Sequence, residues 1–521
     1  MLIVGGGPVG LSASLLLSRY GVPSLLVERH AATSVHPKAR GLNVRTLELF
    51  RVWGIEAAVR AASGELERAR DVVWAPTLIA PETKRLPYGG VGERLQDDSP
   101  TTSVGCAQDV LEPILLDAAN GYGLGERRFG VELAALRQDE AGVSATMVDC
   151  ETGDETRVRS AYAIAADGAQ SSVRQMLGVE MQGPGALFHR MGIYFRADLR
   201  EIGADRPALL YIVTPPEGAG VIAPVNLVDR WLYMAPYSPE KGDRAQDFDE
   251  ERCVQLVRGA VGIEGLPVDV LSALPWTGAS AVAERFRVGR VFLAGDAAHL
   301  IPPTGGQAMN VGIQDVHNLA WKLAGRLDGW AGDGLLDTYE AERRPFALAV
   351  NDDAARNVAA VGTRPEQFSN RGRVLGVSYD SSAVILDGTE LPAVTNQVMD
   401  YAPTARPGSR APHVWLRRGS ERISALDLFD RSFVLLTGAS DTTWTAAANE
   451  AIVRLRLPIE CLTVGTHGTL IDETGAWTSR YGIESDGAVL VRPDGHVAWR
   501  ATLATAAPEL LSICRSVLDL A

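Results

Sequence analysis

The chain has 521 residues, of which 46% are hydrophobic, enough for about two to four domains with cores of their own. The net charge of −14 argues against nucleic acid or an anionic membrane surface as a partner. The five cysteines lack the spacing of a metal site or a disulfide framework, and no stretch resembles a signal peptide or a transmembrane helix. We therefore expect a cytoplasmic protein that binds no metal.

The first predicted elements are a short apolar strand, Leu2 to Val4, a glycine-rich turn, and a helix that stops at Gly21. A second strand, Ser24 to Val27, ends in Glu28. Strand, turn, helix, strand and terminal acid together predict a dinucleotide-binding unit, whereas the glycines alone could form a coincidental turn. In order, the three glycines would permit the tight turn, the approach of a diphosphate, and close packing of the helix. The candidate ligands here are Gly5, Gly7, Pro8, Gly10, Glu28 and Arg29.

Two polar residues further along could face the same ligand. Gln108 begins the helical stretch QDVLEPILLDAA, where its amide suits a cofactor contact. Arg40 precedes another helix and is equally well explained as a solvated arginine at a helix start.

Short strands follow from about Phe129 to Ile164 and lead to Asp167 and Gly168. Asp-Gly after a strand commonly forms a hairpin turn. Here a helix start follows in place of a returning strand, so we expect the turn to be available to a ligand.

Residues 181–276 contain several strands with alternating apolar residues. The alternation predicts an antiparallel sheet with one face free to cover a ligand, and segment 75–97 is expected to join it. The candidate pocket walls are Tyr194, Tyr211, Val213, Ile222, Pro224, Trp231, Tyr233 and Trp276. Because neighbouring side chains of a strand point to opposite faces, we expect no more than about half of them to touch a substrate.

The stretch RVFLAGDAAHLIPPTGGQAMN, from Arg290 to Asn310, has the pattern of a strand, a loop and a helix. Asp296 follows the buried strand, where a carboxylate suits a ligand hydroxyl. Gly305 and Gly306 would leave backbone N–H groups at the start of the next helix, and such a helix end attracts an anion. For this stretch alone, an ordinary turn before a capped helix is the alternative.

Three of these motifs, in this order and spacing, resemble those of the single-component flavoprotein aromatic hydroxylases, which share the p-hydroxybenzoate hydroxylase fold. The motifs are GGGPVG at 5–10, ADG at 166–168 with SVR at 172–174, and GDAAH at 295–299 with Pro303 and the glycine pair at 305–306. The resemblance spans roughly the first 320 residues and implies bound FAD.

The resemblance also implies residue roles. Asp296 would bind the FAD ribitol, Asp167 would serve both FAD and the nicotinamide cofactor, and Pro303 would lie beside the flavin ring. The other implied cofactor contacts are Arg40, Gln108, Gly168, Gly295, Gly305, Gly306, Met309 and Asn310. The catalytic candidates are Pro303, Arg40 and His299, although His299 could instead be a structural histidine next to Asp296.

The implied fold class is α/β, with three domains. A Rossmann-like FAD domain comprises residues 1–74, 98–180 and 277–400, and an inserted antiparallel-sheet substrate domain comprises residues 75–97 and 181–276. Residues 401–521 resemble the degenerate thioredoxin-like domain of the phenol hydroxylase and 2,4-dichlorophenol hydroxylase branch, which includes polyketide hydroxylases. That domain has no paired thiol, so we expect it to stabilise the fold or a homodimer.

The resemblance implies a monooxygenase that uses FAD, dioxygen and NADPH or NADH to hydroxylate a phenolic or hydroxy-heteroaromatic ring through a flavin C4a-hydroperoxide. The substrate would be a small aromatic or a polyketide, with a slight preference for a bulky ring of secondary metabolism such as antibiotic biosynthesis. A Baeyer-Villiger or epoxidising flavoprotein shares every motif. So does a flavoprotein that controls a reactive intermediate, and a pure binding module fits least well.

Overall fold

The N-terminal strand occupies the middle of a six-stranded sheet in the computed structural model, which describes residues 1–87, 97–216, 218–360, 370–438, 443–466 and 468–520. The strand order is β17-β18-β11-β1-β2-β7, and all neighbours are parallel except β17 and β18. The strands are β1 (Leu2–Val4), β2 (Leu25–Glu28), β7 (Glu126–Phe129), β11 (Ala163–Ala165), β17 (Arg287–Val288) and β18 (Val291–Leu293). This is the expected Rossmann-like sheet.

The helices on this sheet bring distant parts of the chain together. Helix α1 (Pro8–Arg19) packs against both α4 (Gln108–Asn120) and α8 (Ala308–Asp328). Smaller elements complete the domain. They are β3 (Gly41–Leu42), α2 (Val44–Trp53), α3 (Glu56–Ser63), β6 (Val104–Gly105), the meander β8 (Val131–Asp139), β9 (Gly142–Asp149) and β10 (Glu155–Ser160), and α5 (Ser172–Met176).

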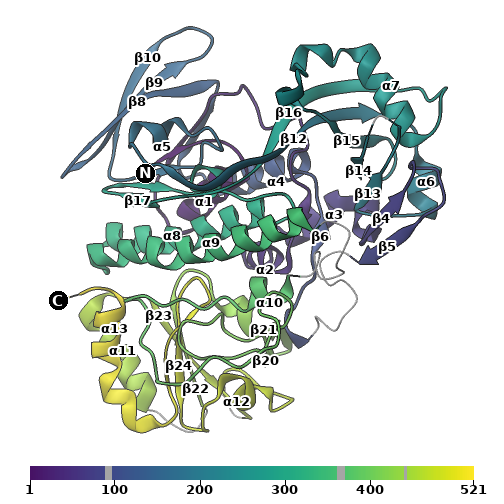
Figure 1. Cartoon of the computed structure of the whole chain (residues 1–521). Coiled ribbons are helices and arrows are strands. Elements are labelled where there is room, and N and C mark those ends of the chain that lie inside the picture. Colours follow the sequence, from purple (N-terminus) through teal and green to yellow (C-terminus); the bar gives the residue numbers. More distant parts are fainter. Residues whose placement is uncertain (88–96, 217, 361–369, 439–442, 467, 521) are drawn as a thin grey trace.

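A second, eight-stranded sheet is inserted into this domain and lies to one side of it (Figure 1). Its order is β19-β16-β12-β15-β14-β13-β4-β5, antiparallel except for the parallel pair β4 and β13. The strands are β4 (Asp71–Ala75), β5 (Lys84–Pro87), β12 (Met181–Arg196), β13 (Leu210–Val213), β14 (Gly220–Pro224), β15 (Arg230–Pro236), β16 (Asp269–Ala283) and β19 (His299–Leu300). Helices α6 (Arg200–Asp205) and α7 (Glu250–Val261) belong to this unit. Part of the segment expected to join it, residues 88–96, lies outside the described residues.

The C-terminal part has a four-stranded sheet of order β23-β22-β24-β25, with β22 parallel to β23 and antiparallel to β24. This is the strand order of a thioredoxin core, as expected. Its elements are β20 (Trp415–Arg418), β21 (Glu421–Ser424), β22 (Phe433–Gly438), α11 (Thr443–Leu455), β23 (Ile459–Val464), α12 (Ala476–Tyr481), β24 (Ala488–Val491), β25 (Val497–Ala501) and α13 (Leu510–Val517). All five cysteines of the chain are free thiols.

Helices α8, α9 (Thr338–Ala359) and α10 (Arg371–Leu375) lie between the N-terminal and C-terminal sheets (Figure 1). Asp494, in the turn of the last hairpin, accepts hydrogen bonds from Trp321 Nε1 at 3.2 Å and Asn318 Nδ2 at 3.3 Å. Buried Glu342 pairs with Lys322 at 2.7 Å and Arg492 at 2.6 Å. These buried charges are paired across the interface, so the C-terminal domain is docked through specific contacts.

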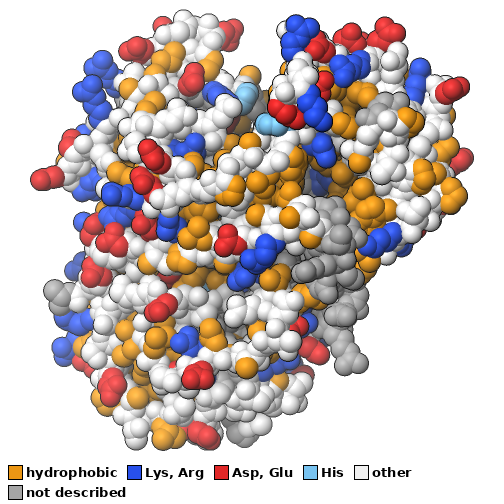
Figure 2. All heavy atoms as spheres, viewed as in Figure 1, with side chains coloured by type: hydrophobic (Ala, Val, Ile, Leu, Met, Phe, Trp, Pro, Cys, Tyr) orange, Lys and Arg blue, Asp and Glu red, His pale blue; other side chains and the backbone are white. Residues whose placement is uncertain are grey.

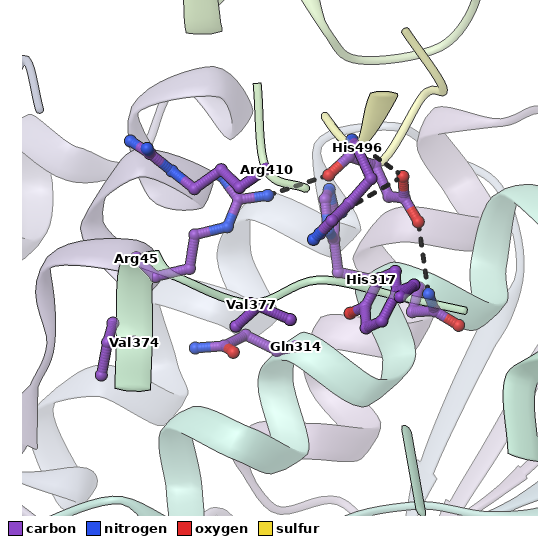
Figure 3. Close-up of a pocket in the computed structure, with 10 residues that line it drawn as sticks. Arg45, Gln314, His317, Val374, Val377, Arg410 and His496 are labelled. Carbon is purple, nitrogen blue, oxygen red and sulfur yellow. Dashed lines mark hydrogen bonds and ion pairs between the residues drawn. The ribbon is translucent and has the colours of Figure 1, made fainter. Parts of the chain in front are cut away.

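A small polar cavity lies in this interface, lined by residues that include Arg45, His317, Arg410 and His496 (Figure 3). Its volume of about 10 Å³ suffices for about one water molecule. It is therefore too small for a substrate. Within the described residues, no helix combines the length and hydrophobicity needed to cross a bilayer.

Candidate active site

The glycine-rich turn after β1 is shaped by two close contacts and one open side. A Cβ on Gly5 would stand 2.2 Å from Ala166 O, and one on Gly10 would stand 1.9 Å from Gly5 O. At Gly7 the only neighbour of such a Cβ would be Glu112 Oε1 at 4.0 Å. The turn therefore packs tightly on both flanks and leaves its middle glycine half-buried, with room for a ligand ahead of Pro8 at the start of α1.

Glu28 lies at the end of β2, directly beside this turn. Its carboxylate accepts hydrogen bonds from Gly6 N at 2.6 Å and from His30 N at 2.9 Å. Burial alone would raise the pKa of Glu28, but these N–H groups hold that pKa below its usual value. The carboxylate is thus ionised and fixed at the rim of the turn, while Arg29 is exposed.

The Gly-Asp loop after β18 comes to the same sheet edge. Strand β11 alone separates β18 from β1, so the ends of these two strands are about 10 Å apart. A Cβ on Gly295 would stand 2.8 Å from Val9 Cγ2, so the loop packs directly on the start of α1. Asp296 is accessible to solvent, although its neighbours in the loop are buried. The protein around its carboxyl excludes enough water to raise the pKa of that group. Asp296 therefore lies in a recess beside the glycine turn.

The Asp-Gly segment after β11 borders this recess. The carboxylate of Asp167 accepts from Ser171 Oγ at 2.5 Å and Val173 N at 3.1 Å, so it holds the start of α5. Arg174 donates to Ala297 O at 3.1 Å and ties the segment to the Gly-Asp loop. Gly168 has a φ of 83° and open space around it. The backbone at Gly168, and not the carboxylate of Asp167, is thus available to a ligand.

Helix α8 begins at Ala308 and not at Gly305, because Gly305 and Gly306 have φ values of 93° and 62° that no helix can use. Pro303 is exposed just before them and Met309 is half-buried. No side chain caps the helix start, so its first N–H groups are left for a ligand or water.

Asn310 was expected to contact a cofactor, but its side chain is fully committed elsewhere. It is completely buried. Its Oδ1 accepts from Asn43 N at 2.9 Å, and its Nδ2 donates to Gly41 O at 2.9 Å. The side chain of Asn310 therefore fixes the loop of Arg40 against α8, and a cofactor contact at this position stays a prediction.

Of the two roles left open for His299, a base or a structural histidine, the geometry favours the structural one. The side chain is fully buried, with Nε2 2.7 Å from Asp315 Oδ2. The other oxygen of Asp315 accepts from Arg343 Nε at 2.8 Å, and Asp315 also accepts from Gly295 N at 3.1 Å. Because this network lies behind the loop, His299 holds the Gly-Asp loop in place and does not face the recess.

The two polar residues of uncertain role contact different neighbours. Arg40 donates to Pro224 O at 3.0 Å, which links the N-terminal domain to the inserted sheet. Gln108 donates to Glu112 Oε1 at 2.7 Å, and Glu112 Oε2 accepts from Ser34 N at 2.6 Å. Burial raises the pKa of Glu112. The sequence analysis did not single out this residue. Its position four residues after Gln108, on the same helix face, was the available signal.

Six of the eight candidate pocket walls lie on the face of the inserted sheet that α7 covers. Tyr211, Ile222 and Tyr233 are register partners across three strands, so they share one face. That face is packed under α7 in a closed core. The six residues are Tyr211, Val213, Ile222, Pro224, Trp231 and Tyr233, with Pro224 placed by its pairing with Trp231. Helix α7 covers them, so they stabilise the sheet.

The opposite face of the sheet is turned toward the N-terminal domain. Trp276, one of the two remaining candidates, is half-buried there, near Gly192. Tyr194 is on the same face and makes an edge-on contact with His36, at 6.0 Å between ring centroids. His36 also reaches Ser272 Oγ of β16 at 2.8 Å. The sequence analysis missed His36, since only the fold brings its loop over the sheet.

The molecular surface is notched between the lobe that carries β8–β10 and the lobe that carries α7 (Figure 2). The ends of β1, β2 and β18 of the Rossmann-like sheet, with the loops that follow them, bring together Gly7, the ionised carboxylate of Glu28 and the carboxyl of Asp296. The uncapped start of α8 completes this set. This donor set fits the diphosphate, hydroxyl and ring groups of FAD. Fold and site together define a flavin-dependent oxidoreductase with an inserted sheet beside the flavin edge.

Comparison with known families agrees with this class. Residues 1–354 match the family described as FAD binding domain, and residues 404–521 match the family described as aromatic-ring hydroxylase, C-terminal. The chain belongs to the FAD-dependent aromatic-ring hydroxylases, and it is an FAD-binding monooxygenase.

Individual relatives match the chain over almost its full length. The tetracenomycin A2 monooxygenase-dioxygenase of Streptomyces glaucescens is 40% identical, over 99% of this chain and 96% of that protein. The crystal structure of the flavin-dependent monooxygenase PieE with FAD and substrate is 36% identical with a TM-score of 0.94, covering 100% and 99% of the two chains. Aklavinone-11 hydroxylase in a ternary complex with FAD and aklavinone is 37% identical with a TM-score of 0.87, covering 99% and 98%.

Proposed function

We propose that this chain hydroxylates a phenolic or hydroxy-heteroaromatic ring of a polyketide-type substrate, with dioxygen and NADPH or NADH as co-substrates, in the biosynthesis of an antibiotic-like metabolite. The observation that carries the proposal is the unsealed face of the inserted sheet beside the recess of Asp296. Leu274 on this face is 45% exposed, and Val35, next to His36, is 79% exposed. Such exposed apolar side chains suit a flat, apolar ring system.

The cofactor contacts follow from the geometry of the recess. Gly7 and the start of α1 would hold the FAD diphosphate, Glu28 a ribose, and Asp296 the ribitol. The uncapped start of α8 and Pro303 would lie along the flavin ring, where the partial positive charge of a helix end stabilises negative charge on the ring. FAD, once bound, supplies electron transfer from the nicotinamide and activation of dioxygen.

The residues of the chain would bind and orient the ring and exclude water. Trp276 and Tyr194 supply apolar surface with fixed orientation, and Arg40 joins the flavin domain to the sheet that covers the substrate. Burial of the ring in this cleft keeps water from the reactive flavin. We also propose the domain limits already given, with the inserted sheet reaching back to Asp71.

Products formed by the FAD-loaded protein test this function. We expect NADPH or NADH oxidation to accelerate when hydroxylated anthraquinones or simple phenols are added, with a product that gains one oxygen atom as a ring hydroxyl. Mass spectrometry detects the gain, and NMR separates a hydroxyl from an ester. An ester product would favour the Baeyer-Villiger alternative. Absence of stimulation by every ring would contradict the proposal.

A further inference from the structure

We propose that His36 contacts the substrate and accepts, at Nε2, the proton of a ring hydroxyl next to the carbon that receives oxygen. This inference rests on the proposed function and assigns a proton acceptor to it. The residue that the sequence first suggested for this role, His299, is sealed behind the Gly-Asp loop. His36 is the histidine that the fold brings over the unsealed face of the inserted sheet.

The imidazole of His36 is held on two sides. Its Nδ1 lies 2.8 Å from Ser272 Oγ, and Tyr194 contacts the ring edge-on. Only 8% of the residue is exposed. The ring therefore has one orientation, and that orientation turns Nε2 away from Ser272.

The other ring nitrogen of His36, Nε2, faces Gly192 of β12. A Cβ on Gly192 would stand 3.4 Å from His36 Nε2 and 3.7 Å from Trp276 Cδ1. Nε2 thus lies above the sheet, next to Trp276, a candidate pocket wall on the face turned toward the flavin domain. Among the described residues, none forms a hydrogen bond with Nε2. A ring hydroxyl packed against Trp276 would meet this atom.

The loop that carries His36 is fixed from the flavin side. Ser34 Oγ donates to His36 O at 3.0 Å, and Ser34 N donates to the buried carboxyl of Glu112 on α4 at 2.6 Å. Helix α4 also supplies Gln108 and lies near the glycine turn. His36 is therefore placed by the same elements that form the flavin recess, as a reacting group must be.

The protonation state of His36 suits an acceptor. Burial, followed by the charge of Lys38 on the same loop, lowers the pKa of His36 to about 4. Other polar groups around it are Glu112 on α4, Arg190 on β12, and Arg230 on β15, which donates to Tyr194 OH at 3.2 Å. The ring is neutral at pH 7. When Nδ1–H donates to Ser272, the lone pair at Nε2 is free.

The proton step balances without another reactant. As oxygen is transferred to the ring carbon, the substrate O–H bond breaks, an N–H bond forms at Nε2, and the electron pair stays on the ring oxygen. When the ring regains aromaticity, the carbon loses its hydrogen to solvent as a proton, the C–H electron pair returns to the ring, and the ring oxygen takes a proton back from Nε2. A neutral imidazole is suited to this role because oxygen transfer makes the hydroxyl strongly acidic.

The test compares His36→Ala with a matched histidine. His189 also pairs with a hydroxyl of β16, Thr277 Oγ1 at 2.9 Å, but it alternates to the other side of β12. We expect His36→Ala to lower the hydroxylation rate at pH 7 by about 10²-fold or more, measured with the hydroxyanthraquinone that the wild type converts fastest, aklavinone included in the panel. The rate of the variant should rise with pH as the substrate ionises by itself. His189→Ala should match the wild type.

FAD content should be unchanged in His36→Ala, which separates proton acceptance from a folding defect. A wild type that hydroxylates the ring while His36→Ala has the same rate and pH profile would overturn this inference alone. A wild type that converts no ring would overturn the proposed function and this inference with it.

Discussion

Both faces of the inserted sheet carry aromatic and other apolar side chains, but one face is covered by α7 and the other is turned toward the flavin domain. On one face Trp231 and Tyr233 are fully buried beneath α7. On the other, Trp276 is half-buried and Leu274 is 45% exposed, opposite the flavin domain. Aromatic side chains therefore do not mark the pocket. The side on which a covering helix packs decides which residues hold the sheet together and which can meet a ligand.

The largest expected effect is on the sealed face. Trp231→Ala should lower the free energy of unfolding by about 3–5 kcal/mol, because a fully buried indole is replaced by a cavity. Thermal unfolding followed by circular dichroism measures the change. The rate per correctly folded, FAD-loaded molecule should stay close to that of the wild type. A selective loss of substrate affinity without loss of stability would show that this face is the pocket.

The matched change on the open face should have the reverse result. Trp276→Ala should alter stability little, since the side chain keeps partial contact with solvent, and should raise KM for the ring substrate by about tenfold through lost stacking and burial. Steady-state kinetics and thermal unfolding on the same preparation separate the two effects. An unchanged KM together with a large fall in stability would remove Trp276 from the substrate site.

A smaller effect is expected at Gly192 on the same open face. Gly192→Ala adds a methyl group 3.4 Å from His36 Nε2, a van der Waals contact that leaves less room beside the imidazole for a ring hydroxyl. We expect kcat to fall a few-fold while FAD binding and unfolding temperature stay constant. Single-turnover hydroxylation measures the change, and an unaltered rate would place the substrate away from this position.

The smallest effect is a difference in pH dependence. His36 has a folded pKa of about 4, against about 6.5 in the unfolded chain. Between these values the unfolded state binds more protons, so the free energy of unfolding falls as pH decreases from 6.5 to 4, by up to about 1.4 kcal/mol per pH unit. His36→Asn should remove the contribution of one titrating group from the slope of the free energy of unfolding against pH. An equal slope would show that His36 is solvated. The buried residues His317 and His496 will still contribute to this pH dependence in the variant, since burial lowers their pKa values to about 3 and about 4.

The sequence was most informative where backbone geometry itself demands a residue. Gly5 and Gly10 are required by contacts of about 2 Å with backbone oxygens, and Asp296 follows a strand of three buried residues. These local patterns predicted the Rossmann-like sheet and the recess at its edge. The thioredoxin-like strand order was expected from the family resemblance of residues 401–521.

The features that the sequence did not predict depend on contacts between distant segments of the chain. Alternation predicted two faces of the inserted sheet but not which one α7 covers. The sequence alone did not decide whether His299 is a base or a structural residue. Its contact with Asp315, sixteen residues later in α8, favours the structural role. His36 meets Ser272 across 236 positions of sequence. No local pattern indicated that the carboxylate of Asp494, in the turn of the last hairpin, accepts a hydrogen bond from Trp321 of α8.

The most direct test of the whole account is FAD affinity after Asp296→Ala, with Asp328→Ala, an exposed aspartate at the far end of α8, as control. Titration of the apoprotein with FAD, followed by flavin fluorescence, gives both dissociation constants. We predict that Asp296→Ala weakens binding by about 10- to 100-fold, the loss of a hydrogen bond to a charged group, and that Asp328→Ala binds as the wild type does. An Asp296→Ala protein that retains wild-type FAD affinity would contradict the claim that the Gly-Asp loop and the glycine turn bind one flavin together.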